Sequence, residues 1–200
     1  MTINTDQSSK PKPPVLPTDF RGVGRYVVPV LGIEVPLLWN ANSGNMQMIA
    51  GVQGDPVHFT NVIYDGILYT LTYAFPGIPR NPCSTIGPFS LLDLNGHLAE
   101  AHYVGSMTLD EVEPRRVNHF RVAAAWEPPP GLIPPIAGLP ILRLPVMAGD
   151  IYVDADDSSL WRRLLHFGIQ NAYAADLDEW ILLDEFDHVA GEVVLPSECG

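Results

Sequence analysis

The chain has 200 residues, of which 46% are hydrophobic and 17% charged, and its formal net charge is −12. This balance excludes a chain that is disordered throughout, because such chains combine low hydrophobicity with high charge. An acidic surface repels phosphates, so we expect neither nucleic acid nor an anionic membrane as the partner.

The chain begins with a polar, proline-rich segment. Met1 to Pro17 has no apolar stretch of the kind found in secretory signal peptides. We therefore expect a flexible leader over residues 1–19 and a single domain over residues 20–200. No segment reaches the roughly 18 uninterrupted apolar residues of a membrane-spanning helix. The sequence thus predicts no transmembrane segment and a cytoplasmic protein.

Strand patterns dominate from Phe20 onward. Gly44 to Val52 alternates apolar and other residues with period two. Next, Val57 to Tyr64 and Ile67 to Tyr73 flank Asp65-Gly66. Asp-Gly between two β-rich runs predicts a hairpin, because a type I′ turn needs positive φ at both central residues.

The second half of the chain predicts further strands over His102 to Leu109, Val117 to Trp126, Gly149 to Asp154 and Trp180 to Phe186. Between them, Pro128 to Pro145 is too rich in proline for a central strand and too apolar to lie free in water. We expect this loop to act as a lid over an opening in the domain. An ordinary packed crossover is the alternative.

One segment shows helical spacing. Ser158 or Ser159 can cap a helix in which Leu160, Trp161, Leu164, Leu165 and Ile169 recur on one side. The sequence therefore predicts one main helix over about residues 159–171.

Several features, in chain order, resemble a known superfamily: a Tyr-rich hairpin followed by Cys83, the sequence Tyr103-Val104-Gly105, the strand Val117 to Val122, the sequence Asp150 to Asp154, Phe186, and a terminal Leu-Pro-x-x-Cys. They are similar to the superfamily of the bacterial lipoprotein carriers LolA and LolB and the secreted ependymin-related proteins, over about residues 24–199. The resemblance implies a mainly β fold, in which a strongly curved antiparallel sheet forms an unclosed barrel. It also implies an apolar hollow, plugged by helices, that accepts acyl chains or other apolar ligands.

The chain departs from this pattern by lacking an export signal and the larger cysteine set of the secreted members. The two cysteines that it retains, Cys83 and Cys199, correspond to a pair in the family pattern. The resemblance therefore implies that their sulfurs lie near each other.

Four residues are candidates for catalysis. On the predicted strand Val117 to Ala125, His119 and Arg121 alternate with Phe120 and Val122. They are either solvated polar residues or a proton shuttle and oxyanion partner on the wall of the hollow. Tyr69 can add a phenolic donor. Asp184 follows an apolar run, and it is either a buried acid or base or part of an exposed strand end.

Soft and flat apolar side chains suit the lining of a pocket for an apolar ligand, although core packing explains most of them equally well. The candidates for ligand binding are Trp39, Met46, Met48, Tyr73, Met107, Ile136, Leu139 and Met147. The six histidines match no standard zinc spacing, so we expect neither a metal nor a cofactor.

The sequence thus predicts binding of an apolar small molecule in a half-barrel, for a cofactor-independent rearrangement, cyclisation or isomerisation. The alternative is a non-catalytic carrier or chaperone for lipid or another hydrophobic ligand. A structural protein that meets a basic partner is a third reading. Polar groups that converge inside the hollow would favour catalysis, whereas an entirely apolar hollow would favour carriage.

Overall fold

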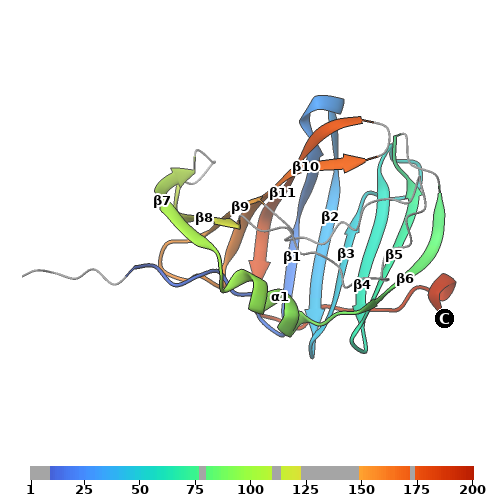
Figure 1. Cartoon of the computed structure of the whole chain (residues 1–200), viewed down its shortest axis with the longest axis horizontal. Coiled ribbons are helices and arrows are strands. Elements are labelled where there is room, and N and C mark those ends of the chain that lie inside the picture. The colour runs from blue at the N-terminus through green and yellow to red at the C-terminus, as the bar shows by residue number, and fades with distance from the viewer. Residues whose placement is uncertain (1–9, 77–79, 110–113, 123–148, 172–173) are drawn as a thin grey trace, which may run out of the picture.

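The computed structural model describes residues 10–76, 80–109, 114–122, 149–171 and 174–200, and only the backbone of residues 165–171 and 174–178. Its strands form one antiparallel sheet in the order β6-β5-β4-β3-β2-β1-β11-β10-β9-β8-β7 (Figure 1). The order ends at β6 and β7, and the sheet is not closed into a barrel. The predicted fold class, mainly β with an open antiparallel sheet and one helix, is confirmed. The strands are β1 (Phe20–Val28), β2 (Ile33–Asn42), β3 (Asn45–Ala50), β4 (His58–Tyr64), β5 (Ile67–Ala74), β6 (Asn81–Pro88), β7 (His102–Leu109), β8 (Arg115–Val122), β9 (Gly149–Asp154), β10 (Trp161–Asn171) and β11 (Ala174–Asp187).

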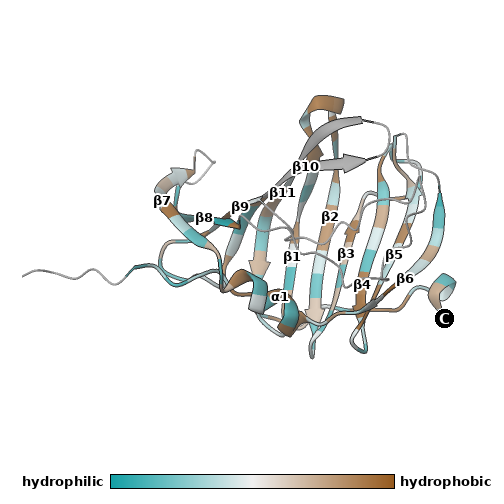
Figure 2. Cartoon of the chain, in the orientation of Figure 1, coloured by the Kyte–Doolittle hydropathy of each residue, from teal (hydrophilic) through white to brown (hydrophobic). Residues whose placement is uncertain are grey.

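Alternation along the strands gives the sheet two different faces, and Figure 2 shows apolar and polar residues following one another along the strands. The face that carries Phe20, Trp39 and Met48, which we call the inner face, holds the main apolar cluster. The opposite, outer face carries Arg25, Glu34 and other polar side chains. Because side chains alternate, one strand can serve both faces.

The hairpin predicted at Asp65-Gly66 is confirmed. Tyr64 pairs with Ile67 across the turn, and both turn residues have positive φ, 49° for Asp65 and 73° for Gly66. A type I′ turn requires this backbone, and Asp-Gly is one of the residue pairs that favour it.

The helix lies at α1 (Leu91–Leu98), and the prediction of a helix over residues 159–171 is wrong. Ser90 and Asp93 form a capping box at the start of α1, in which each side chain accepts from the backbone N–H of the other residue. Leu91, Leu94 and Leu98 are buried and belong to the apolar cluster of the inner face. Two short 3-10 helices, η1 (Pro29–Leu31) and η2 (Ser197–Cys199), complete the described elements.

The segment expected to be helical is instead β10, which pairs with β9 and β11. Its register shifts between Trp161 and Arg163. This irregularity allows Trp161 and Leu164, three residues apart, both to be buried in the apolar cluster. A β-bulge thus reproduces a spacing that normally indicates a helix. Ser159 bonds to Asp157 in a turn and caps no helix.

The N-terminal segment is held to the domain from well before residue 20. Leu16 is buried, and the side-chain amide of Asn95 donates to its C=O and accepts from its N–H. The indole of Trp161 donates to the C=O of Val15. The expected leader over residues 1–19 is therefore too long. Residues 1–9 lie outside the described residues.

The C-terminal segment crosses the outer face. Asn40 and Gln47 on β2 and β3 bond to the backbone of Glu192 and Val194, and Cys199 forms a disulfide with Cys83 on β6. Their Cα atoms are 5.5 Å apart, so the expected proximity of the two cysteines is confirmed. We call residues 189–200 the strap.

The predicted lid, Pro128 to Pro145, falls within residues 123–148 and lies outside the described residues. None of the helices in the described part of the chain is long and apolar enough to cross a membrane.

Candidate functional site

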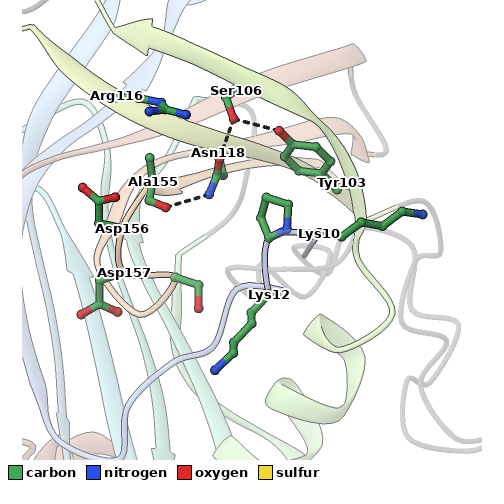
Figure 3. Close-up of a pocket in the computed structure, with 11 residues that line it drawn as sticks. Lys10, Lys12, Tyr103, Ser106, Arg116, Asn118, Ala155, Asp156 and Asp157 are labelled. Atoms are coloured by element: carbon green, nitrogen blue, oxygen red, sulfur yellow. Dashed lines mark hydrogen bonds between the residues drawn. The ribbon is translucent and has the colours of Figure 1, made fainter. Parts of the chain in front are cut away.

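A pocket of about 630 Å³ lies at the β7–β8–β9 end of the sheet (Figure 3). This volume falls within the range typical of small-molecule sites. Four separate stretches of the chain form its walls: the N-terminal segment, β7, β8 and the turn after β9. The lining residues are Lys10, Pro11, Lys12, Tyr103, Ser106, Arg116, Asn118, Ala155, Asp156, Asp157 and Ser158.

The N-terminal wall is fixed by bonds to α1 and β10. Each of the two hydrogen bonds between Asn95 and Leu16 is 2.8 Å long. The N–H of Val15 donates to the C=O of Ser158, and the indole of Trp161 lies 2.9 Å from the C=O of Val15. These bonds keep Lys10 and Lys12 beside the pocket.

A directed chain of hydrogen bonds crosses the pocket wall (Figure 3). The amide nitrogen of Asn118 donates to the C=O of Ala155 at 3.2 Å, so its oxygen faces Ser106 and accepts from that hydroxyl at 2.7 Å. A serine hydroxyl has only one proton. The hydroxyl of Tyr103, 2.8 Å from Ser106, must therefore be the donor of that pair. The order of donation is thus Tyr103 to Ser106 to Asn118 to Ala155.

The pocket adjoins the apolar inner face. The ring of Tyr103 meets the ring of Phe120 edge-on, with centroids 5.6 Å apart. Phe120 is buried in the apolar cluster, whereas 39% of the surface of Tyr103 is exposed. Tyr103 therefore joins the polar pocket to the core.

The predicted residues His119 and Arg121 meet on the outer face, around the buried carboxylate of Asp150. His119 Nε2 lies 2.7 Å from Asp150 Oδ1, and Arg121 makes two bonds, Nε to Oδ1 at 2.9 Å and Nη2 to Oδ2 at 3.0 Å. Strand register explains the meeting, because Arg121 pairs with Asp150 and His119 pairs with Tyr152. Phe120 and Val122 face the core. The alternative in which His119 and Arg121 lie on the wall of the hollow is therefore wrong.

The charge of Asp150 is held by its neighbours. Burial alone raises the pKa of this carboxyl, but hydrogen bonds from Arg121 and His119 outweigh burial and lower its pKa. The ionised carboxylate only accepts, so His119 donates from Nε2 and leaves Nδ1 as its proton-accepting nitrogen. The ring of Tyr152 stacks on His119 at 4.6 Å, and burial raises the pKa of the Tyr152 phenol. An oriented imidazole of this kind can act as a general base or serve as a structural ion pair.

The other two catalytic candidates lie elsewhere. Tyr69 is on β5, near the opposite end of the strand order from β8. Asp184 is exposed and lies 3.5 Å from Arg25 on the outer face. The register of β1 and β11 shifts between Val23 and Gly24, which pair with Glu185 and Leu183, so Asp184 is the extra residue of a bulge. That bulge breaks the alternation that placed Asp184 with Phe186.

The residues predicted to bind ligand also separate. Trp39, Met46 and Met48 are buried in the apolar cluster, where Trp39 packs against Phe20 and Trp161. Tyr73 bonds to Glu198 of the strap on the outer face. Met107 is 47% exposed on β7. The remaining three, Ile136, Leu139 and Met147, lie outside the described residues.

A second pocket, of about 480 Å³, contains Asp184 and lies beside a serine, a histidine and an aspartate. Ser159 Oγ donates to Asp157 at 2.6 Å and lies 3.0 Å from His188 Nε2. Because the single hydroxyl proton points to Asp157, His188 is the donor to Ser159. The histidine therefore does not deprotonate this serine, and the arrangement lacks the activated nucleophile of a serine hydrolase.

Sequence reasoning missed Asp150, Asn118 and both lysines as site residues. Asp150 carried a signal, because a charged residue at the start of a strand of apolar alternation needs a partner when it is buried. The sequence contains no such signal for the pocket, because its lining residues are far apart along the chain, as with Lys12, Ser106, Asn118 and Asp156. Within the described part of the chain, no group of three or more His, Cys, Asp or Glu residues could hold a metal ion.

Comparison of the chain with known proteins adds no relative: no family model matches it, and no curated protein matches it.

Proposed function

We propose that the protein binds a small amphipathic molecule without transforming it, as a carrier does. The polar end would occupy the pocket of Figure 3, and the apolar part would lie toward the inner face. The contact between Tyr103 and Phe120 is the observation that carries the proposal, because it joins a polar pocket of ligand size to the main apolar cluster.

Polar groups do converge in the pocket, but carriage is favoured over catalysis because the candidate catalytic residues lie elsewhere. His119, Arg121, Tyr69 and Asp184 all lie on the outer face, and only the first two meet. General acid-base catalysis needs a group within hydrogen-bond reach of the reacting atom. None of the four lines the pocket that adjoins the apolar cluster.

The proposal is tested with the apolar fluorescent probe N-phenyl-1-naphthylamine. We expect saturable binding to one site, and we expect Ser158→Phe, which fills the pocket, to weaken binding at least tenfold. Ser197→Phe places the same ring on the exposed η2 and serves as the matched control. Equal binding by both variants would overturn the proposed site.

A cofactor-independent isomerase or cyclase is the second candidate, favoured by the oriented His119 with Tyr152 stacked on it. This function predicts that a bound ligand is chemically altered and that His119→Gln prevents the change. Carriage predicts that mass spectrometry recovers the ligand unchanged from the wild-type protein.

A further inference from the structure

The pocket of Figure 3 is lined by charged side chains of both signs. The sequence contains only two lysines, Lys10 and Lys12, and both line this pocket. Asp156 and Asp157 lie together on the other side, as Figure 3 shows. Arg116 adds a third positive charge and lies beside Asp156 in Figure 3, on the same side as the aspartates. A local excess of positive charge is unusual in a chain whose net charge is −12.

The hydroxyl of Tyr103 can accept a further hydrogen bond but has no proton left to donate. Tyr103 and Ser106 each use their one hydroxyl proton in the chain of bonds that ends at Ala155, and Asn118 uses one of its two amide protons there. The lone pairs of the Tyr103 hydroxyl remain available as acceptors. A ligand group that bonds to the Tyr103 oxygen must therefore supply the proton, as an N–H or O–H group.

We infer that the pocket recognises a zwitterionic head group, in which an ammonium bearing N–H protons sits beside an anionic phosphate or carboxylate. The ammonium faces the two aspartates and the Tyr103 oxygen, and the anion faces the lysines. This inference rests on the proposed function and specifies its ligand class.

Other head groups fit less well. A purely anionic head would lie against Asp156 and Asp157, and a purely cationic head against Lys10 and Lys12. A quaternary ammonium has the right charge but no N–H for the Tyr103 oxygen. Like charges brought together and polar groups left unpaired both reduce affinity. We therefore expect the pocket to select among these head groups.

The test compares three lysolipids that share a lauroyl chain, each kept below its critical micelle concentration. Their head groups are phosphoethanolamine, phosphocholine and phosphoglycerol, and calorimetry measures the dissociation constants. We expect the phosphoethanolamine lipid to bind at least about tenfold more tightly than the other two, the effect of one hydrogen bond to a charged group.

Free O-phosphoethanolamine as a competitor separates the two sources of this head group. If free O-phosphoethanolamine competes at a concentration similar to that of the lysolipid, the ligand is a free zwitterion. If it does not compete, the ligand is the lipid. Either result supports the head-group assignment.

Variants of single walls give the internal check. Asp156 is exposed, and only its backbone N–H makes a hydrogen bond in the described structure, so Asp156→Asn keeps the turn and removes one charge. This variant should bind the phosphoglycerol lipid more tightly and lose the preference for phosphoethanolamine. The double variant Lys10→Gln, Lys12→Gln should weaken all three phosphate lipids. Asp65→Asn, in the distant β4–β5 turn, should change nothing.

The outcomes separate the two proposals. If none of the lysolipids binds, the proposed function fails and the head-group assignment fails with it. If all three bind equally, or if phosphoglycerol binds best, the proposed function stands and the zwitterion assignment is overturned. A preference for phosphoethanolamine that survives Asp156→Asn also overturns the assignment to this pocket.

Discussion

The side-chain amide of Asn95 on α1 bonds both the N–H and the C=O of Leu16, each at 2.8 Å. Through these two bonds the only helix longer than one turn in the described structure holds the N-terminal wall of the candidate pocket. One side chain thereby couples the stability of α1 to the position of Lys10 and Lys12.

Replacing Asn95 by Ala removes both bonds and leaves two backbone groups of Leu16 without these partners. We expect a loss of about 1–3 kcal/mol in the free energy of unfolding, because buried polar groups without partners are costly. Proteolysis near residues 10–17 should also become faster. Asn42→Ala, at an exposed position, is the control, and equal stability of the two variants would contradict the anchoring role.

The ion-pair cluster on the outer face predicts a pH dependence. The pKa of Asp150 is lowered, so its ionised form adds stability at any pH above the ordinary aspartate value, and this stability is lost as the pH falls through the lowered value. We expect Asp150→Asn to cost about 1–3 kcal/mol at pH 7, toward the low end because Arg121 is half exposed.

Denaturation of wild type and Asp150→Asn between pH 7 and pH 2 measures this dependence. The difference between them should shrink only below about pH 4. Asp184→Asn, at an exposed carboxylate, should show little difference at any pH. A difference in the free energy of unfolding that stays constant down to pH 2 would contradict the stabilising role of the ionised Asp150.

The disulfide between Cys83 and Cys199 joins residues separated by 116 positions. In the chain-entropy model, closing such a loop adds about 4–5 kcal/mol to the free energy of unfolding. The double variant Cys83→Ser, Cys199→Ser should therefore lose a large part of that free energy, as measured by urea denaturation. Reduced wild-type protein should match the variant. A reducing cytosol keeps such pairs as thiols. The cytoplasmic location expected from the sequence and the oxidised pair therefore predict different thiol states in cells, which alkylation trapping measures.

Two glycines provide a matched pair of tests for the fold. A Cβ added at Gly24 would lie 1.9 Å from the carbonyl oxygen of Leu182, whereas one added at Gly96 in α1 would meet nothing within 4 Å. Gly24→Ala should destabilise the protein by about 1–3 kcal/mol, the range of overpacking. Gly96→Ala should stabilise it by up to about 1 kcal/mol, since alanine favours a helix. Similar melting temperatures for both variants would contradict the packing of β1 against β11.

Structure that depends on neighbouring residues could be predicted from the sequence, whereas the register between strands could not. Asp65-Gly66 specified its turn because only the backbone of those two residues decides it. Trp161 and Leu164 suggested a helix because a bulge brings these residues, three apart, into one buried cluster. A second bulge takes Asp184 out of the strand alternation and leaves it exposed. Helix α1 has only eight residues and contains Gly96, so its periodic signal was weak. His119 and Arg121 were recognised as neighbours, but their partner Asp150 follows from strand pairing alone.

A ligand seated between the N-terminal segment and β7–β9 can be detected most directly through the two lysines of the chain. Amine acetylation of the protein is followed by mass spectrometry with and without the lauroyl phosphoethanolamine lysolipid, and the α-amino group of the chain is the internal reference. We expect the ligand to slow acetylation of Lys10 and Lys12 severalfold, while the α-amino group reacts as before. Saturating ligand that leaves both lysines as reactive as in the free protein would contradict this prediction.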